Sequence, residues 1–94
     1  MNFNISEDMC KDTIEYYGVD QTTVVAMEEC SEVIQELSKF IRGIGNKRHL
    51  SEEIADVLIT LKEVCIMYEL KSEDIQNAII YKQFRQARRM QGVD

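Results

Sequence analysis

Proline is absent from this 94-residue chain, and glycine occurs only four times. Because proline breaks helices and glycine weakens them, a chain this poor in both can be helical along most of its length. Apolar residues recur at helical spacing, and glutamate, lysine and glutamine occupy many positions between them. We therefore predict an all-α fold with helices over residues 6–17, about 20–42, 51–69 and 72–90.

The expected helix boundaries follow from capping residues and from glycine. Ser6, Ser51 and Ser72 each precede acidic residues, a pattern typical of helix N-termini. Gly18 is expected to end the first helix. Residues 43–49, GIGNKRH, are expected to form a flexible basic loop, because Gly and Asn favour turns.

The length of the chain is that of a single domain, here taken as residues 1–94. A domain of this size buries only about two-thirds of its unfolded surface. The second and third helices also carry apolar residues beyond one core-facing stripe: Met27, Ile34, Ile41, Ala55, Ile59 and Ile66. We therefore expect a small four-helix-type bundle that is completed by oligomerisation.

The net charge of −6 argues against a nucleic-acid partner, because phosphate backbones bind basic surfaces. The N-terminus shows no basic-then-apolar signal segment, and the apolar runs are too short to span a bilayer. We expect no membrane association and a cytoplasmic location. The three cysteines, Cys10, Cys30 and Cys65, are widely spaced and are expected to be buried reduced thiols.

An acidic signature occurs twice: EECSEVIQELSK at residues 28–39 and EEIADVLITLKE at residues 52–63. The acids that repeat three positions apart are Glu29 with Glu32 and Glu53 with Asp56. Side chains three apart share one helix face, and here each pair borders the apolar stripe of its helix. If the two helices face each other, four carboxylates converge, and such a cluster favours a bound divalent cation.

The type of metal follows from the available ligands. Di-iron helical bundles use Glu-x-x-His motifs, and neither repeat contains a histidine. The one histidine, His49, lies in the expected loop, where a solvated role is the simpler interpretation. Oxygen-only ligation favours Mg²⁺, with Mn²⁺ as an alternative. Glu-rich helices are common and one EExxE motif is weak evidence, but two copies that both border a core stripe favour a metal site.

These residues resemble a known family. EECSE at 28–32 followed by EIAD at 53–56 matches the EExxE…ExxD signature of the MazG-like all-α nucleoside triphosphate pyrophosphohydrolases. The resemblance covers about residues 20–90 and is strongest to short single-domain members, including those of phage and prophage. It implies that Glu29, Glu32, Glu53 and Asp56 bind Mg²⁺. It also implies hydrolysis of a (deoxy)nucleoside triphosphate between the α and β phosphates, and a homodimer or homotetramer.

The resemblance further implies a phosphate-binding lysine on the last helix, and Lys82 fits that position. The family often has Asn four residues later, where this chain has Gln86. Arg85 and Arg89 lie on roughly the same face as Lys82 and are candidate phosphate contacts, although Arg89 also suits a solvated helix C-terminus. Lys39, with the basic residues after it, could close over a triphosphate, or these residues form a plain solvated surface.

Glu36 and Glu28 are the candidates for the general base that activates water. Glu36 lies within about 20° of Glu29 on the helical wheel, whereas Glu28 is turned about 100° away, so Glu36 is the preferred candidate. Thr60 occupies the place of Glu36 in the second copy of the signature. The alternative functions are a non-catalytic helical interaction module and a nucleotide or metal binder without turnover.

Overall fold

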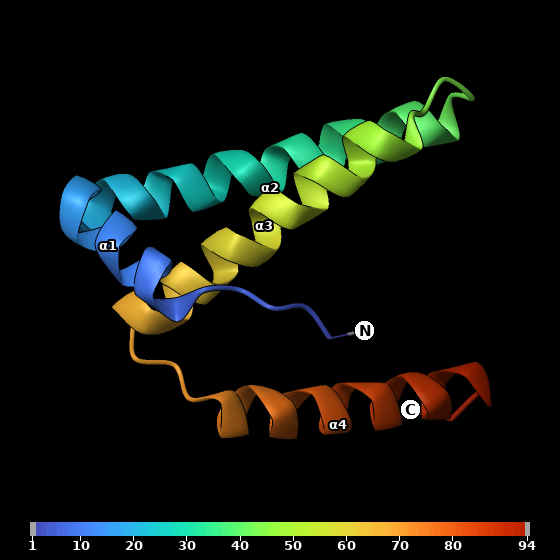
Figure 1. Ribbon diagram of the computed structural model, residues 1–94. Coiled ribbons are helices and arrows are strands. Elements are labelled where there is room, and N and C mark those ends of the chain that lie inside the picture. Colours follow the sequence, from blue (N-terminus) through green and yellow to red (C-terminus); the bar gives the residue numbers. More distant parts are fainter. Residues whose placement is uncertain (1, 94) are drawn as a thin grey trace.

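The computed structural model describes residues 2–93, which form four helices and no strand. The helices are α1 (Glu7–Tyr17), α2 (Val19–Ile41), α3 (Lys47–Met67) and α4 (Ser72–Met90). The all-α prediction is confirmed, and Figure 1 shows the arrangement.

The α2–α3 helix pair is the centre of the structure, and the two helices run antiparallel with the most extensive packing in the chain (Figure 1). Helix α1 crosses one end of the pair and contacts both helices. The buried residues all come from these three helices: Cys10, Thr22, Ala26, Glu36, Thr60 and Glu63. Most of these are polar or charged, so one chain encloses only a small apolar core.

The α1–α2 corner depends on Ser6 and Gly18. The Ser6 Oγ accepts a hydrogen bond from the Met9 N–H at 3.1 Å, which caps α1 as expected. Gly18 has a φ of 87° and donates its N–H to the Ile14 carbonyl at 2.8 Å. Residues with a Cβ rarely adopt this φ, so glycine permits the abrupt change of direction between the two helices.

The start of α3 differs from the prediction. Asn46 is the N-cap, and its side-chain oxygen accepts the His49 N–H at 3.0 Å. Ser51 lies inside the helix and donates its Oγ–H to the Lys47 carbonyl at 2.9 Å. The expected cap at Ser51 was therefore wrong, because Asn caps a helix about as well as Ser and lies earlier in the chain. The basic residues from Lys47 to His49 form the first turn of α3 and are not a flexible loop.

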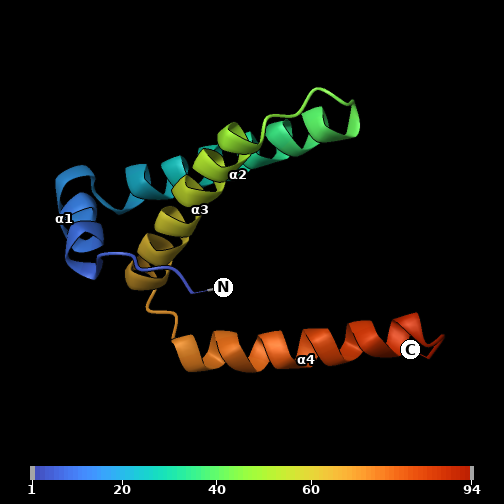
Figure 2. The same ribbon diagram turned by 45° about the vertical axis from the view of Figure 1, so that its right-hand side comes forward.

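Helix α4 stands apart from the other three. It makes no packing contact with α1, α2 or α3 among the described residues, and both views show it extending away from the helix pair (Figures 1 and 2). Residues 68–71 connect it to α3, with Glu69 in the left-handed region at a φ of 55°. No side chain of α4 is buried. Within one chain the packed bundle thus contains three of the four helices.

Candidate functional site

The doubled acidic signature meets at the α2–α3 contact. Glu29 and Glu32 come from the middle of α2, and Glu53 and Asp56 come from the facing part of α3. Carboxylate oxygens of Glu29, Glu53 and Asp56 all lie within 4.8 Å of one another. The Glu32 carboxyl lies beside that of Glu53, close enough for the two to share a proton. We call these four residues the acidic cluster.

Two carboxyls of the acidic cluster, those of Glu53 and Glu29, have raised pKa values. The hydrogen bond to Glu32, partial burial and the charges of Glu32, Asp56 and Glu29 raise the pKa of Glu53 to about 7. The pKa of Glu29 is also raised, first by desolvation and then by the charges of Glu32 and Asp56. In the absence of a cation, repulsion between the acids is thus relieved by bound protons.

The acidic cluster fits a hard divalent cation. The Oε2 atoms of Glu29 and Glu53 are buried and have no hydrogen-bond partner. A buried charged oxygen without a partner is costly, and a cation would satisfy it. The donor set contains oxygen alone, which suits Mg²⁺ or Mn²⁺ better than zinc or iron. Among residues 2–93, this is the one place where at least three potential ligands come together.

Glu36 lies two turns beyond Glu29 on α2 and is 8% exposed. Its Oε2 accepts a hydrogen bond from the Lys39 Nζ at 2.8 Å, and its Oε1 is buried without a partner. The geometry thus gives Glu36 one paired and one unpaired oxygen. Lys39 balances the charge of Glu36 and is not held at the acidic cluster. Glu28 is exposed at the surface of α2.

The candidate phosphate contacts of α4 are not brought to the acidic cluster within one chain. Lys82 and Arg89 are exposed, and α4 does not pack along α2 or α3. The Arg85 guanidinium lies 5.9 Å from the centre of the Tyr81 ring on the same helix. In the part of the chain that the structure describes, no ion pair involves a basic residue of α4.

Two buried polar residues on the α2–α3 pair were missed by the sequence analysis. Thr22, seven residues before Glu29, is buried with its Oγ1 unpaired. Glu63, seven residues after Asp56, is also buried, and desolvation raises its pKa. Seven residues make about two helical turns, so spacing from the acidic cluster is the signal that could have identified both.

The cysteines are placed differently from the prediction. Cys10 is buried, but Cys30 is exposed and Cys65 is only partly covered. Cys30 lies at the edge of the apolar stripe of α2, and its side chain is exposed there. All three are free thiols, as expected.

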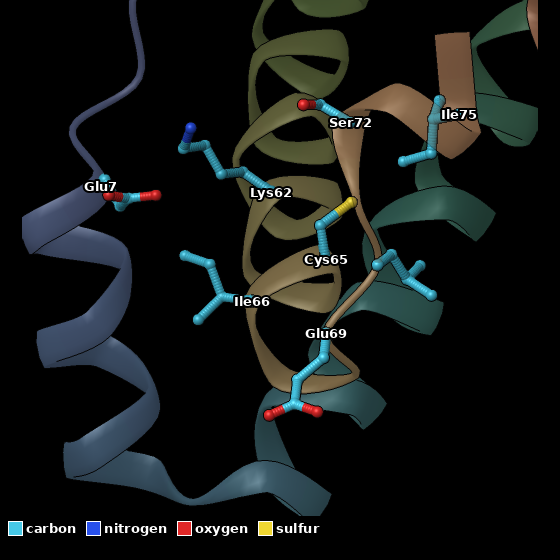
Figure 3. Close-up of a pocket in the computed structure, with 8 residues that line it drawn as sticks. Glu7, Lys62, Cys65, Ile66, Glu69, Ser72 and Ile75 are labelled. Carbon is cyan, nitrogen blue, oxygen red and sulfur yellow. The ribbon is translucent and has the colours of Figure 1, made fainter. Parts of the chain in front are cut away.

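The cavity at the junction of α1, α3 and α4 is separate from the acidic cluster. Its volume is about 470 Å³, and Figure 3 shows Lys62, Cys65 and Ile66 of α3 facing it together with Ser72 and Ile75 of α4. None of the four clustered acids lines it. This cavity forms where the first turn of α4 follows the end of α3, and it is not the candidate site.

Fold and site together define a class: an all-α protein with an oxygen-only carboxylate cluster, suited to a hard divalent cation, between two antiparallel helices. Residues 18–89 match the model of the MazG nucleotide pyrophosphohydrolase domain, and the chain therefore belongs to that family. The matched region contains α2, α3 and nearly all of α4, and it begins after α1. The family supports nucleotide pyrophosphohydrolase activity and divalent-metal dependence.

Comparisons with curated proteins and with solved structures gave no significant match. Among the described residues, none of the helices combines the length and the apolar character needed to cross a membrane.

Proposed function

We propose that this protein is a Mg²⁺-dependent nucleoside triphosphate pyrophosphohydrolase. It would cleave the bond between the α and β phosphates of a (deoxy)nucleoside triphosphate, with water as the second reactant, to give the monophosphate and pyrophosphate. The observation that carries the proposal is the convergence of three carboxylates within 4.8 Å, in a chain whose family hydrolyses nucleotides.

Glu29, Glu32, Glu53 and Asp56 would hold the Mg²⁺, and Mn²⁺ suits the same donors. When bound, the cation supplies charge neutralisation for the phosphates and lowers the pKa of water. The buried Oε2 atoms of Glu29 and Glu53 have no other partner, which supports this assignment. The protein contributes the fixed positions of these oxygens, which the rigid α2–α3 pair supplies before substrate arrives.

Glu36 is the proposed general base. Its Oε1 has no partner and can accept a proton from the attacking water, while the Lys39 ammonium holds Oε2 at 2.8 Å and keeps the side chain in place. Glu28 remains the second candidate for this role, although its exposure gives it no fixed orientation.

The triphosphate is the proposed partner of the basic residues. Lys82, Arg85 and Arg89 would contact its phosphates, and Lys39 would add positive charge nearby. A homodimer or homotetramer is proposed because large apolar side chains remain exposed on every helix of the chain. The acidic net charge of −6 disfavours a nucleic-acid partner. A cytoplasmic location stays a prediction.

The test is a pyrophosphate-release assay over common and modified (deoxy)nucleoside triphosphates, with and without Mg²⁺. Glu32→Ala and Asp56→Ala should each lower the rate about 100-fold or more while helical circular dichroism is kept. Glu52→Gln is the matched control, because Glu52 precedes Glu53, is 62% exposed and pairs only with Arg48 at 3.6 Å. Full activity in both the Glu32 and the Asp56 variants would contradict the proposal.

The same assay separates catalysis from binding alone. If no nucleotide is turned over but Mg²⁺ with a nucleotide raises the melting temperature, the chain is a binder without turnover. If neither effect occurs, the chain is a helical interaction module that keeps the family fold.

A further inference from the structure

Helix α1 is held on the α2–α3 pair by few side chains. Cys10 is the one residue of this helix that is buried. Larger side chains of α1 remain 51–80% exposed: Met9, Tyr16 and Tyr17. An isolated helix of 11 residues is unstable in water, so α1 keeps its form only while it is docked. It also lies outside residues 18–89, which match the family domain, so a small change in free energy can release it without unfolding that domain.

A buried carboxyl lies where α1 docks. Glu63 of α3 is 4% exposed, and burial is the one cause of its raised pKa. No ion pair among residues 2–93 involves this side chain. Glu63, Cys10 and Thr13 line the same cavity of about 290 Å³ beside α1. A carboxylate that loses its water without gaining a partner destabilises the docked state whenever it is charged. The contact between α1 and α3 is thus most stable while Glu63 is protonated.

The charged groups of α1 and α3 at this contact do not balance Glu63. The Cys10 thiol is its neighbour on α1, and burial and then the charge of Glu63 raise the pKa of that thiol. Lys62 lowers the pKa of Cys10 and Glu7 raises it, so these two charges act in opposite directions. Figure 3 shows both side chains in the space between α1 and α3. Neither contributes to the shift at Glu63, which burial alone produces.

Helix α2 and the N-terminal segment present uncharged groups at this level. The antiparallel register that brings Glu29 beside Asp56 also places Thr22 level with Glu63, because each lies seven residues further along its helix. Thr22 is 3% exposed, and its Oγ1 has no hydrogen-bond partner. Asn4 of the N-terminal segment lines the cavity and is also uncharged. The surroundings of Glu63 are therefore polar in places but supply no balancing charge.

We propose that α1 is a pH-sensitive cover over one end of the α2–α3 pair, and that ionisation of Glu63 releases it. Once α1 has left, the carboxyl is in water with its ordinary pKa of 4.5. Because the docked state raises that pKa, docking is most stable below pH 4.5 and weakens as pH rises from 4.5 through the raised value. Release would uncover Thr22 and Glu63, which lie about two helical turns from the acidic cluster.

Reactivity of Cys10 measures the release of α1, because a maleimide reaches this buried thiol only when the helix leaves. The wild-type chain is labelled with N-ethylmaleimide, and each cysteine is quantified by peptide mass spectrometry. The exposed Cys30 is the internal reference for the general effect of pH on thiol reactivity. The Cys10 rate relative to the Cys30 rate should rise about fivefold or more between pH 5 and pH 8. With Glu63→Gln this ratio should stay nearly constant. A wild-type ratio that does not change with pH would overturn the proposal, as would an equal rise in Glu63→Gln.

Glu53→Gln is the matched control. Its carboxyl also has a raised pKa, of about 7, but it belongs to the acidic cluster and not to the contact with α1. This variant should keep the rise of the Cys10 ratio with pH. Loss of the rise in Glu53→Gln would assign the pH dependence to the acidic cluster and overturn the proposal.

Hydrogen exchange locates the effect without a thiol reagent. At pH 7.5 the amides of α1 should exchange several-fold more slowly in Glu63→Gln than in the wild type, because the buried charge is gone. Amides in the middle of α2, residues 24–36, should be unchanged. Unchanged exchange in α1, or slower exchange spread equally over α2, would overturn the proposal.

Discussion

The α2–α3 pair and α4 are helices of similar length with very different surroundings. The pair buries Thr22, Glu36, Thr60 and Glu63 and brings three carboxylates within 4.8 Å of one another, whereas α4 buries no side chain at all. The pair thus holds its carboxylates in defined positions, whereas no other described helix packs against α4 to fix the positions of its basic residues. A helix with a functional residue does not by itself form a site. The contact that holds the helix decides where that residue acts.

Two basic residues of α4, Lys82 and Arg85, give the largest expected effect. Lys82→Ala combined with Arg85→Ala should lower the rate of pyrophosphate release about 100-fold, because positive charge near developing phosphate charge is worth that much in comparable sites. The assay is steady-state turnover with excess Mg²⁺. Lys71→Ala is the control, since Lys71 only precedes the first turn of α4. Equal losses in both variants would show a general charge effect and would count against a specific role for α4.

Metal binding should depend on pH through the acidic cluster. The pKa of Glu53 is about 7 in the folded chain and 4.5 in the reference state, so the folded state holds the extra proton between these values. Without metal, this group therefore makes the protein less stable as pH rises from about 4.5 to 7. Mg²⁺ displaces the proton, so the gain in Tm on adding Mg²⁺ should be larger at pH 8 than at pH 5. At a concentration 100 times its Kd, Mg²⁺ should raise the free energy of unfolding by about 2.7 kcal/mol.

Differential scanning fluorimetry with and without a chelator measures that gain. Glu53→Gln should remove most of the pH dependence of the metal-free protein. If Mg²⁺ raises the Tm equally at both pH values, the acidic cluster is not where the cation binds.

The ion pair in the α2–α3 region should contribute more to stability than a pair at the surface. Lys39→Met leaves the buried Glu36 carboxylate without its partner at 2.8 Å and should cost about 1 kcal/mol in the free energy of unfolding. Lys11→Met removes an exposed pair at 3.8 Å and should cost less than about 0.5 kcal/mol. Urea denaturation at pH 7 compares the two. A larger loss of unfolding free energy in Lys11→Met than in Lys39→Met would contradict this prediction.

Glu63 should give the smallest effect. Desolvation raises the pKa of this carboxyl, so its charged form destabilises the folded state, and this cost appears only above the unfolded-state pKa of 4.5. Glu63→Gln should therefore raise the Tm at pH 8 and leave it nearly unchanged at pH 4.5. Glu69→Gln is the control, since Glu69 is exposed at the end of α3. The same Tm change at both pH values for Glu63→Gln would show that packing and not charge is responsible.

The sequence predicted the features that depend on local geometry. Side chains three residues apart share a helix face, so spacing alone was enough to pair Glu29 with Glu32 and Glu53 with Asp56. The apolar periodicity likewise predicted all four helices. The start of α3 was missed because Asn46 and Ser51 both have the character of caps, and spacing alone does not choose between them.

Features that depend on contacts between distant segments could not be predicted. Burial of Cys10 and of Glu63 follows from α1 crossing the end of the α2–α3 pair, which no local pattern encodes. Cys30 was expected to be buried because it lies near an apolar stripe, but the structure leaves its side chain exposed. The separation of α4 from the other helices could not be predicted for the same reason. The spacing of its apolar residues predicts a helix but does not say which surface, of this chain or of another, that helix packs against.

Titration of Mn²⁺ at pH 7.5, followed by electron paramagnetic resonance, tests most directly whether the acidic cluster binds a divalent cation. The wild-type chain and Glu52→Gln should both bind Mn²⁺, and Mg²⁺ should compete for the same site. Glu29→Gln combined with Asp56→Asn should lose this binding while helical circular dichroism is kept. A double variant that binds Mn²⁺ as tightly as the wild type would contradict the assignment of the acidic cluster as the metal site.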